Sequence, residues 1–115
     1  MVRSMNPITT GANRPPYQQP TPLGIYFIQR KLSEMLFLKD GSDDEGGFAP
    51  YASRFTGGAY LHGVPVNYPD NKLIEYSWTL GTTPRSHMCV RNATSHAKFM
   101  YDWAEVEKTL VIVFD

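Results

Sequence analysis

The sequence lacks a second cysteine and an excess of charge. Cys89 is the only cysteine among 115 residues. A lone cysteine cannot form a disulfide within the chain, so disulfide chemistry gives no information on the cellular compartment. Eleven basic side chains balance eleven acidic ones. A neutral chain has no cationic field to attract nucleic acid or an anionic membrane, which excludes charge-driven binding of either kind.

Long apolar runs are also missing from the sequence. No segment approaches the ~20 apolar residues of a membrane-spanning helix, and residues 1–11 have no apolar core of signal-peptide length. A chain of 115 residues can bury one core but not two. We therefore expect a single domain over residues 1–115 that is either cytoplasmic or preceded by a targeting region.

Strand-like segments dominate the sequence after a proline-rich start. The prolines of residues 6–22 predict an extended loop without regular hydrogen bonding. Residues 32–38 fit either a strand or a short helical turn, and residues 67–71 carry a turn signal. A continuous apolar run at residues 109–114 is typical of a buried strand. Further β-branched and aromatic runs favour strands at residues 24–30, 58–66 and 73–80.

One segment has helical periodicity. Apolar or aromatic side chains recur at the spacing of one helix face at Ala97, Met100, Tyr101 and Ala104. This spacing predicts an amphipathic helix of about three turns, with Thr94 as its N-cap. The sequence therefore predicts a mainly β domain with one helix directly after the cysteine.

The surroundings of the cysteine are polar and cationic in RSHMCVRN, residues 85–92. A structural cysteine suits apolar neighbours, whereas cationic and hydrogen-bonding neighbours lower a thiol pKa and favour a nucleophile. A nucleophilic thiol also needs a base. His87 would share a face with Cys89 in an extended segment, and His62 ends a predicted strand before Gly63. A buried core thiol is the alternative.

Two metal sites can be considered from the residue types. Carboxylates cluster at residues 43–45, but without the alternating spacing and closing glutamate of an EF-hand, so we interpret this segment as a solvated loop. The His87-x-Cys89 spacing is tighter than usual for zinc, and no second cysteine pair is present. We therefore predict no metal site, although four zinc ligands could come from His62, His87, Cys89 and His96.

Four motifs, in order along the chain, resemble the catalytic domain of the L,D-transpeptidases, the cysteine enzymes that cross-link bacterial peptidoglycan. The family has a Thr-Gly step, a Thr-Pro-x-Gly start of a strand, a His-Gly pair and a Ser-His-Gly-Cys block. The matching segments here are residues 9–11, 21–24, 62–63 and 86–91. The resemblance implies a β-sandwich-like catalytic fold. It covers nearly the whole chain, and the family's first strands have no counterpart, so we expect an N-terminally incomplete domain.

The resemblance also implies the catalytic residues. Cys89 would attack the carbonyl that links the third residue of a peptidoglycan stem peptide, a diamino acid, to its terminal D-alanine. His62 would be the general base, oriented by a backbone carbonyl such as that of Gly63. His87 and Ser86 would shape the nucleophilic turn. A thioester acyl-enzyme would form, and a second stem would take the acyl group.

Further roles follow from the same resemblance. Met88 and Gly63 belong to the oxyanion and turn region, where Met88 replaces the usual glycine. A negative φ at Met88 would preserve an oxyanion hole of backbone N–H groups, and a positive φ would be strained. Arg91 would receive a substrate carboxylate or stabilise the turn, and Tyr60 would line the pocket or the core.

The implied partners are donor and acceptor stem peptides, with carbapenem-type β-lactams as inhibitors and no metal or organic cofactor. The implied location is outside the cytoplasmic membrane, reached through an upstream targeting region. Two alternatives remain open from the sequence. One is an L,D-carboxypeptidase, in which water replaces the acceptor amine. The other is an inactive cell-wall-binding domain.

Overall fold

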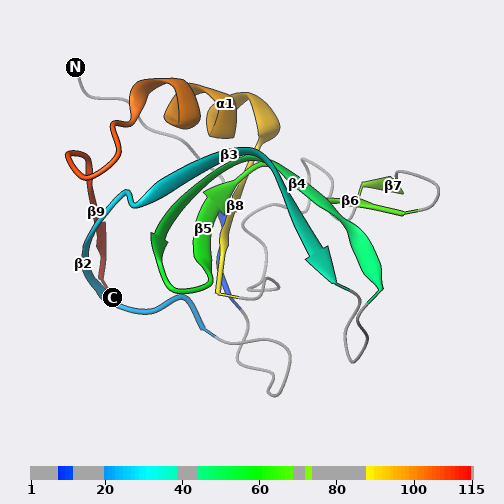
Figure 1. The fold of residues 1–115 in the computed structure, drawn as a ribbon. Helices are drawn as coiled ribbons and strands as arrows, with labels where there is room; N and C mark the ends of the chain where they lie inside the picture. The colour runs from blue at the N-terminus through cyan, green and yellow to red at the C-terminus, as the bar shows by residue number, and fades with distance from the viewer. Residues whose placement is uncertain (1–7, 12–19, 39–43, 69–71, 74–87, 115) are drawn as a thin grey trace.

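The computed structural model describes residues 8–11, 20–38, 44–68, 72–73 and 88–114. The described part is mainly β with one helix, as predicted (Figure 1). Its elements are β1 Ile8–Thr9, β2 Gly24–Phe27, β3 Arg30–Leu38, β4 Glu45–Thr56, β5 Ala59–His62, β6 Val66–Asn67, β7 Lys72–Leu73, β8 Val90–Asn92, α1 Thr94–Trp103 and β9 Leu110–Val113.

The larger sheet has the strand order β1-β8-β5-β4-β6-β7, with β3 also paired to β4. β4 is its centre, because this twelve-residue strand pairs antiparallel with β3, β5 and β6. β5 and β8 run parallel, and the other pairings between described strands are antiparallel. The parallel pair places the end of β5 beside the start of β8, where the cysteine lies.

The core lies between the larger sheet, α1 and a second sheet. β2 and β9 form this two-stranded antiparallel sheet, which stands to one side of the larger sheet in Figure 1. Side chains from the two other layers, Tyr26 and Val111 of the second sheet and Met100 of α1, pack against a cluster of buried residues: Ile28, Phe55, Ala59, Val90 and Ala104. The core therefore covers one face of β5 and β8, and side chains of opposite parity point to the other face.

β9 is a half-exposed strand, so the prediction of a buried strand at residues 109–114 was wrong. Val111 and Val113 pack against the core, whereas Leu110 and Ile112 are 53% and 57% exposed. Only one face of a two-stranded sheet is covered here, and the apolar residues on the other face remain at the surface. Ile112 lies opposite Ile25 of β2, which is 70% exposed.

Two predicted loops contain strand residues. Ile8 and Thr9, in the proline-rich segment, pair with Asn92 and Arg91 of β8. Glu45, the last residue of the acidic segment at residues 43–45, begins β4. Residues 32–38 belong to β3, which resolves their ambiguity in favour of a strand. Residues 74–80 of the predicted strand at 73–80 lie outside the described residues.

Helix α1 has the predicted length and buried face but not the predicted cap. Ala97 and Ala104 are 1% exposed. The N-cap is Ala93, which has no capping side chain, and Thr94 is the first helical residue instead. The Thr94 hydroxyl accepts a hydrogen bond from the Val64 N–H at 3.3 Å. Thr94 therefore joins the helix to the segment after β5.

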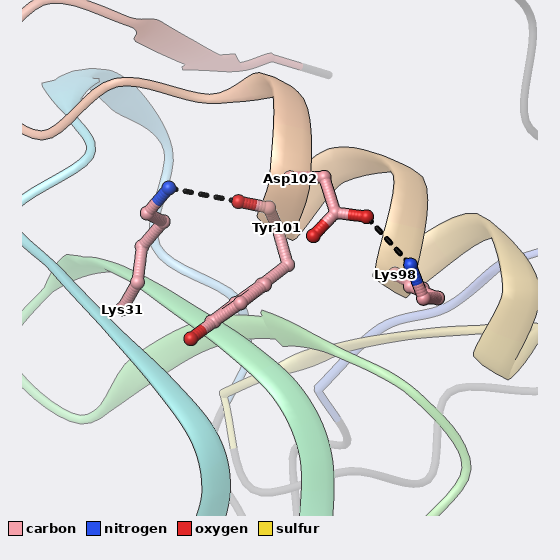
Figure 2. Close-up of polar contacts among 4 residues, drawn as sticks. All are labelled: Lys31, Lys98, Tyr101 and Asp102. Atoms are coloured by element: carbon pink, nitrogen blue, oxygen red, sulfur yellow. Dashed lines mark hydrogen bonds and ion pairs between the residues drawn. The ribbon is translucent and has the colours of Figure 1, made fainter.

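The C-terminal end of α1 is fixed to β3 by a lysine. Figure 2 shows Lys31 Nζ donating to the Tyr101 carbonyl, and a second bond goes to the Ala104 carbonyl, both at 2.8 Å. These carbonyls lack partners within the helix, and a cation there also complements the helix dipole. On the exposed side of α1, Lys98 pairs with Asp102 at 2.7 Å. No helix in the described part is long and apolar enough to cross a membrane.

Candidate active site

The parallel pairing of β5 and β8 brings His62 and the cysteine segment to one face of the sheet. Leu61 pairs with Val90, and both face the core. His62 pairs with Arg91 and must therefore face the opposite side, as must Cys89, two residues before Arg91. Diagonal neighbours of this kind have backbones about 7–8 Å apart. The strand that ends at His62 therefore runs beside the strand that follows Cys89.

The thiol is buried and protonated. Cys89 is 6% exposed, and its Sγ donates to the Gly58 carbonyl at 3.4 Å. Burial raises the pKa of the thiol, and this outweighs the lowering by hydrogen bonding to the Tyr60 backbone and by the Arg91 charge. The expectation of a lowered thiol pKa was wrong, because desolvation disfavours the thiolate more than its cationic neighbour favours it. Such a thiol depends on a base for reactivity.

His62 has the charge state of a general base. Its Nδ1 is 2.6 Å from the Gly63 carbonyl, which can only accept, so Nδ1 carries the proton and Nε2 the lone pair. Burial lowers the pKa of His62 to about 4, with the Gly63 hydrogen bond opposing and the Arg91 charge assisting. The ring is therefore neutral at pH 7. The predicted orientation of His62 by the Gly63 carbonyl is confirmed.

The lowered pKa of His62 also links protonation to folding. The unfolded chain takes up this proton near the ordinary pKa of 6.5, whereas the folded chain resists it down to about 4. The stability that His62 contributes is therefore fully present above pH 6.5 and is lost as the pH falls toward 4. Acid thus destabilises the fold at the position where the base resides.

Gly63 has a different role from the one expected for an oxyanion residue. Its N–H donates to the Pro50 carbonyl at 2.8 Å, so it cannot serve an oxyanion. A side chain at Gly63 would approach Pro50 Cγ to 2.9 Å and Thr94 Oγ1 to 3.0 Å. The missing side chain therefore lets β4 and the start of α1 close around the residue that holds His62. Sequence spacing did not reveal the parts that Pro50 and Thr94 play here.

Met88, directly before the nucleophile, has a left-handed backbone with φ of 69°. A non-glycine residue is strained in this region, so the unfavourable case foreseen from the sequence is the one that occurs. Two observations explain how the turn is held. The Met88 side chain packs against the core, and its carbonyl accepts a hydrogen bond from the Thr21 hydroxyl at 2.8 Å.

Thr21 connects three of the sequence motifs. Its hydroxyl accepts from the Gly11 N–H at 2.9 Å while it donates to the Met88 carbonyl. The Thr-Gly and Thr-Pro-x-Gly segments are thereby joined to the cysteine turn. Thr21 was not predicted as a site residue, because it lies 67 positions from Met88 in the sequence. The order of the motifs was the only feature of the sequence that linked the two residues.

The strain at Met88 predicts an unusual order of stability for two truncations. Both Met88→Gly and Met88→Ala remove the side chain from the core, but only alanine retains the left-handed penalty. We expect urea unfolding to show Met88→Gly more stable than Met88→Ala by about 1 kcal/mol. At a position with ordinary φ glycine would be the less stable of the two. An alanine variant at least as stable as the glycine variant would contradict the assigned strain.

The remaining predicted site residues are placed as follows. Tyr60 is partly buried in β5. Arg91 is 6% exposed in β8, and this burial favours stabilising the strand over receiving a substrate. Asn92, not predicted, donates from Nδ2 to the Val90 and His62 carbonyls at 3.2 and 3.5 Å. Ser86 and His87 lie outside the described residues.

The described residues include no group of three or more metal-ligating side chains. His96 is placed on α1, and the described ranges do not join it with His62 and Cys89 into such a group. The sheet face of His62 and Cys89 carries a neutral imidazole with a defined tautomer, a protonated thiol and a hydrogen-bonded turn. These are the parts needed for nucleophilic acyl transfer.

Comparisons with known proteins point to one family. The profile of the YkuD family, described as the L,D-transpeptidase catalytic domain, matches residues 1–113. A comparison with curated proteins returned no match.

Three solved structures share the fold. An L,D-transpeptidase from Mycobacterium smegmatis has a TM-score of 0.70 at 22% identity, over 99% of this chain and 49% of that chain. An L,D-transpeptidase from Mycobacterium tuberculosis H37Rv has a TM-score of 0.66 at 26% identity, over 96% and 42%. An LD transpeptidase in complex with imipenem has a TM-score of 0.72 at 23% identity, over 98% and 49%. The chain thus spans about half the length of these structures or less.

Proposed function

Because the chain belongs to the L,D-transpeptidase family of catalytic domains, we propose that it is a cysteine-dependent transpeptidase that cross-links peptidoglycan stem peptides. The observation that supports this most strongly is the neutral, oriented His62 on the same sheet face as the only cysteine of the chain. A base that stays unprotonated above about pH 4 suits a thiol whose own pKa is raised.

The first half-reaction forms a thioester. His62 Nε2 takes the proton of Cys89 as Sγ attacks the carbonyl carbon of the third stem residue. Although Met88 has the strained, left-handed φ, it keeps its backbone N–H, and the N–H groups of Met88 and Cys89 are the donors that this turn offers to the oxyanion. The bond to the terminal D-alanine then breaks, and the imidazolium returns its proton to the leaving amine. A thioester at Cys89 thereby replaces the peptide bond, and D-alanine is released.

The second half-reaction transfers the acyl group. The side-chain amine of a second stem attacks the thioester carbonyl, and His62 accepts a proton from that amine. Sγ leaves and recovers a proton from the imidazolium, so the enzyme returns to its starting state. The product is an amide that joins two third residues. Dividing the transfer into two steps is ordinary covalent catalysis.

The same proposal includes β-lactam inhibition and a location outside the cytoplasmic membrane, where peptidoglycan lies. Among the solved structures with this fold, one is a complex with imipenem and another, from Mycobacterium tuberculosis, carries a faropenem-derived adduct. A β-lactam carbonyl would take the place of the stem carbonyl at Cys89. The alternatives are a carboxypeptidase that passes the acyl group to water and an inactive wall-binding domain.

Incubation with tetrapeptide stems separates these functions. We expect cross-linked dimers, read by mass spectrometry, together with released D-alanine. Tripeptide without dimer would show that water is the acceptor and would replace the transpeptidase with a hydrolase. Unchanged stems would contradict both enzymatic functions. A Cys89→Ala sample serves as the matched control for uncatalysed exchange.

A further inference from the structure

A row of side chains crosses the sheet from the thiol to two arginines. Tyr60 precedes the Leu61–Val90 pair by one residue, so it lies beside Cys89, and its backbone hydrogen-bonds to the thiol. Arg54 of β4 is the direct partner of Tyr60, and Arg30 of β3 is the direct partner of Arg54. Directly paired residues share a face of a sheet, so both arginines lie on the face of Cys89 and His62.

Exposure increases along this row. Cys89 is 6% exposed, Tyr60 and Arg54 are partly buried, and Arg30 is exposed. Lys31, the neighbour of Arg30, faces the other way and bonds to α1, which confirms the alternation in β3. The row therefore leads from the buried nucleophile to solvent along the candidate site's face.

The two arginines lack a neutralising partner in the described part of the chain. Like charges directly opposite one another on a sheet repel. The ion pairs between described residues are Lys98–Asp102 and Lys108–Glu105, and neither includes these arginines. Arg54 Nε is also buried without a hydrogen-bond partner among the described residues. An unsatisfied buried donor of a charged group is costly, and an anion between the two guanidinium groups would remove both penalties.

We propose that Arg54, with Arg30 beside it, forms a subsite that binds a carboxylate of the donor peptide. This inference deepens the proposed function and rests on it. Strands are ~4.8 Å apart, so Arg54 lies about 10 Å from the Cys89 backbone along the row. An extended peptide covers ~3.4 Å per residue, and the arginine side chain spans part of the separation, so the carboxylate lies one or two residues from the acylated carbonyl. A guanidinium group fits a carboxylate with two parallel N–H···O bonds.

Binding can be measured apart from chemistry in a Cys89→Ala background, where no acyl-enzyme forms. The probes are a stem tetrapeptide with free carboxyl groups and a matched set in which each carboxyl in turn is an amide. Isothermal titration calorimetry should show about ten-fold weaker binding when the amide replaces the carboxylate that Arg54 contacts. Adding Arg54→Gln should weaken the binding of the free-acid peptide by the same factor. The affinity for that amide peptide should not change.

Two further variants make the result specific. Arg54→Lys should restore part of the preference for the carboxylate, because it keeps the charge but loses the two-point geometry. Lys108→Gln removes a positive charge from the exposed segment before β9 and should change nothing. The unchanged affinity of the amide peptide shows that each variant is folded.

The subsite is refuted if the acid-to-amide ratio is the same with Arg54→Gln as with Arg54, or if the parent protein binds no peptide. Failure of the proposed function gives a different result. Wild-type protein would then form no acyl adduct with any peptide, while the binding ratios would still show whether Arg54 selects a carboxylate.

Discussion

Imipenem will add to the wild-type protein once and will not add to Cys89→Ala. The chain has a single cysteine, so loss of its Sγ removes the only thiol that could open the β-lactam ring. Alanine supplies no nucleophile, and the expected effect is complete loss of the adduct. Intact-protein mass spectrometry measures it directly, with one added mass per wild-type chain.

Lys98→Gln is a suitable control for this comparison, because it changes an exposed residue of the α1 surface whose pair with Asp102 has little effect on stability. It should acquire the adduct at the wild-type rate. Equal labelling of wild type and Cys89→Ala would show that another side chain is acylated and would refute Cys89 as the nucleophile.

His62→Ala will slow the alkylation of Cys89 by iodoacetamide at neutral pH, and the rate will recover as the pH rises. Burial raises the thiol pKa, so without a base the thiolate is scarce until the pH approaches that raised value. In wild type the base form of His62 persists at every pH above about 4, because its pKa is lowered to about 4. The loss of turnover should be roughly 10²- to 10⁴-fold, the usual contribution of a general base.

Two other histidine variants identify the base. His87→Ala should lower turnover and stability but keep part of the neutral-pH reactivity, and His96→Ala, on α1, should follow the wild-type curve. If His62→Ala keeps the wild-type pH profile while His87→Ala loses its neutral-pH reactivity, the base is His87 and the role assigned to His62 is wrong.

The mainly β fold with one helix could be predicted from the sequence, whereas the contacts that support the candidate site could not. His62 and Cys89 were identified from residue types and motif order, which depend on local chemistry. Thr21, Pro50 and Thr94 were missed as supports of the site, because their contacts arise from pairings between distant segments. No spacing rule within one sequence reports such contacts.

The central strand was missed for a related reason. β4 contains Gly46, Gly47 and Pro50 and has a positive φ at Tyr51, so its residues do not show a strand's alternation. Three partner strands compensate for this weak local preference. The burial of Cys89 and the resulting rise in its pKa also depend on surrounding layers, which a list of sequence neighbours does not contain.

The most direct test of this account is the mass of the intact protein after brief mixing with a stem tetrapeptide. A thioester at Cys89 adds the mass of the tetrapeptide minus one D-alanine, and the adduct should disappear when an acceptor amine is supplied, as dimer forms. Its presence in wild type and its absence in Cys89→Ala are the predicted result. Tetrapeptide turnover by wild type with no such adduct at any mixing time, or by Cys89→Ala at the wild-type rate, would contradict it.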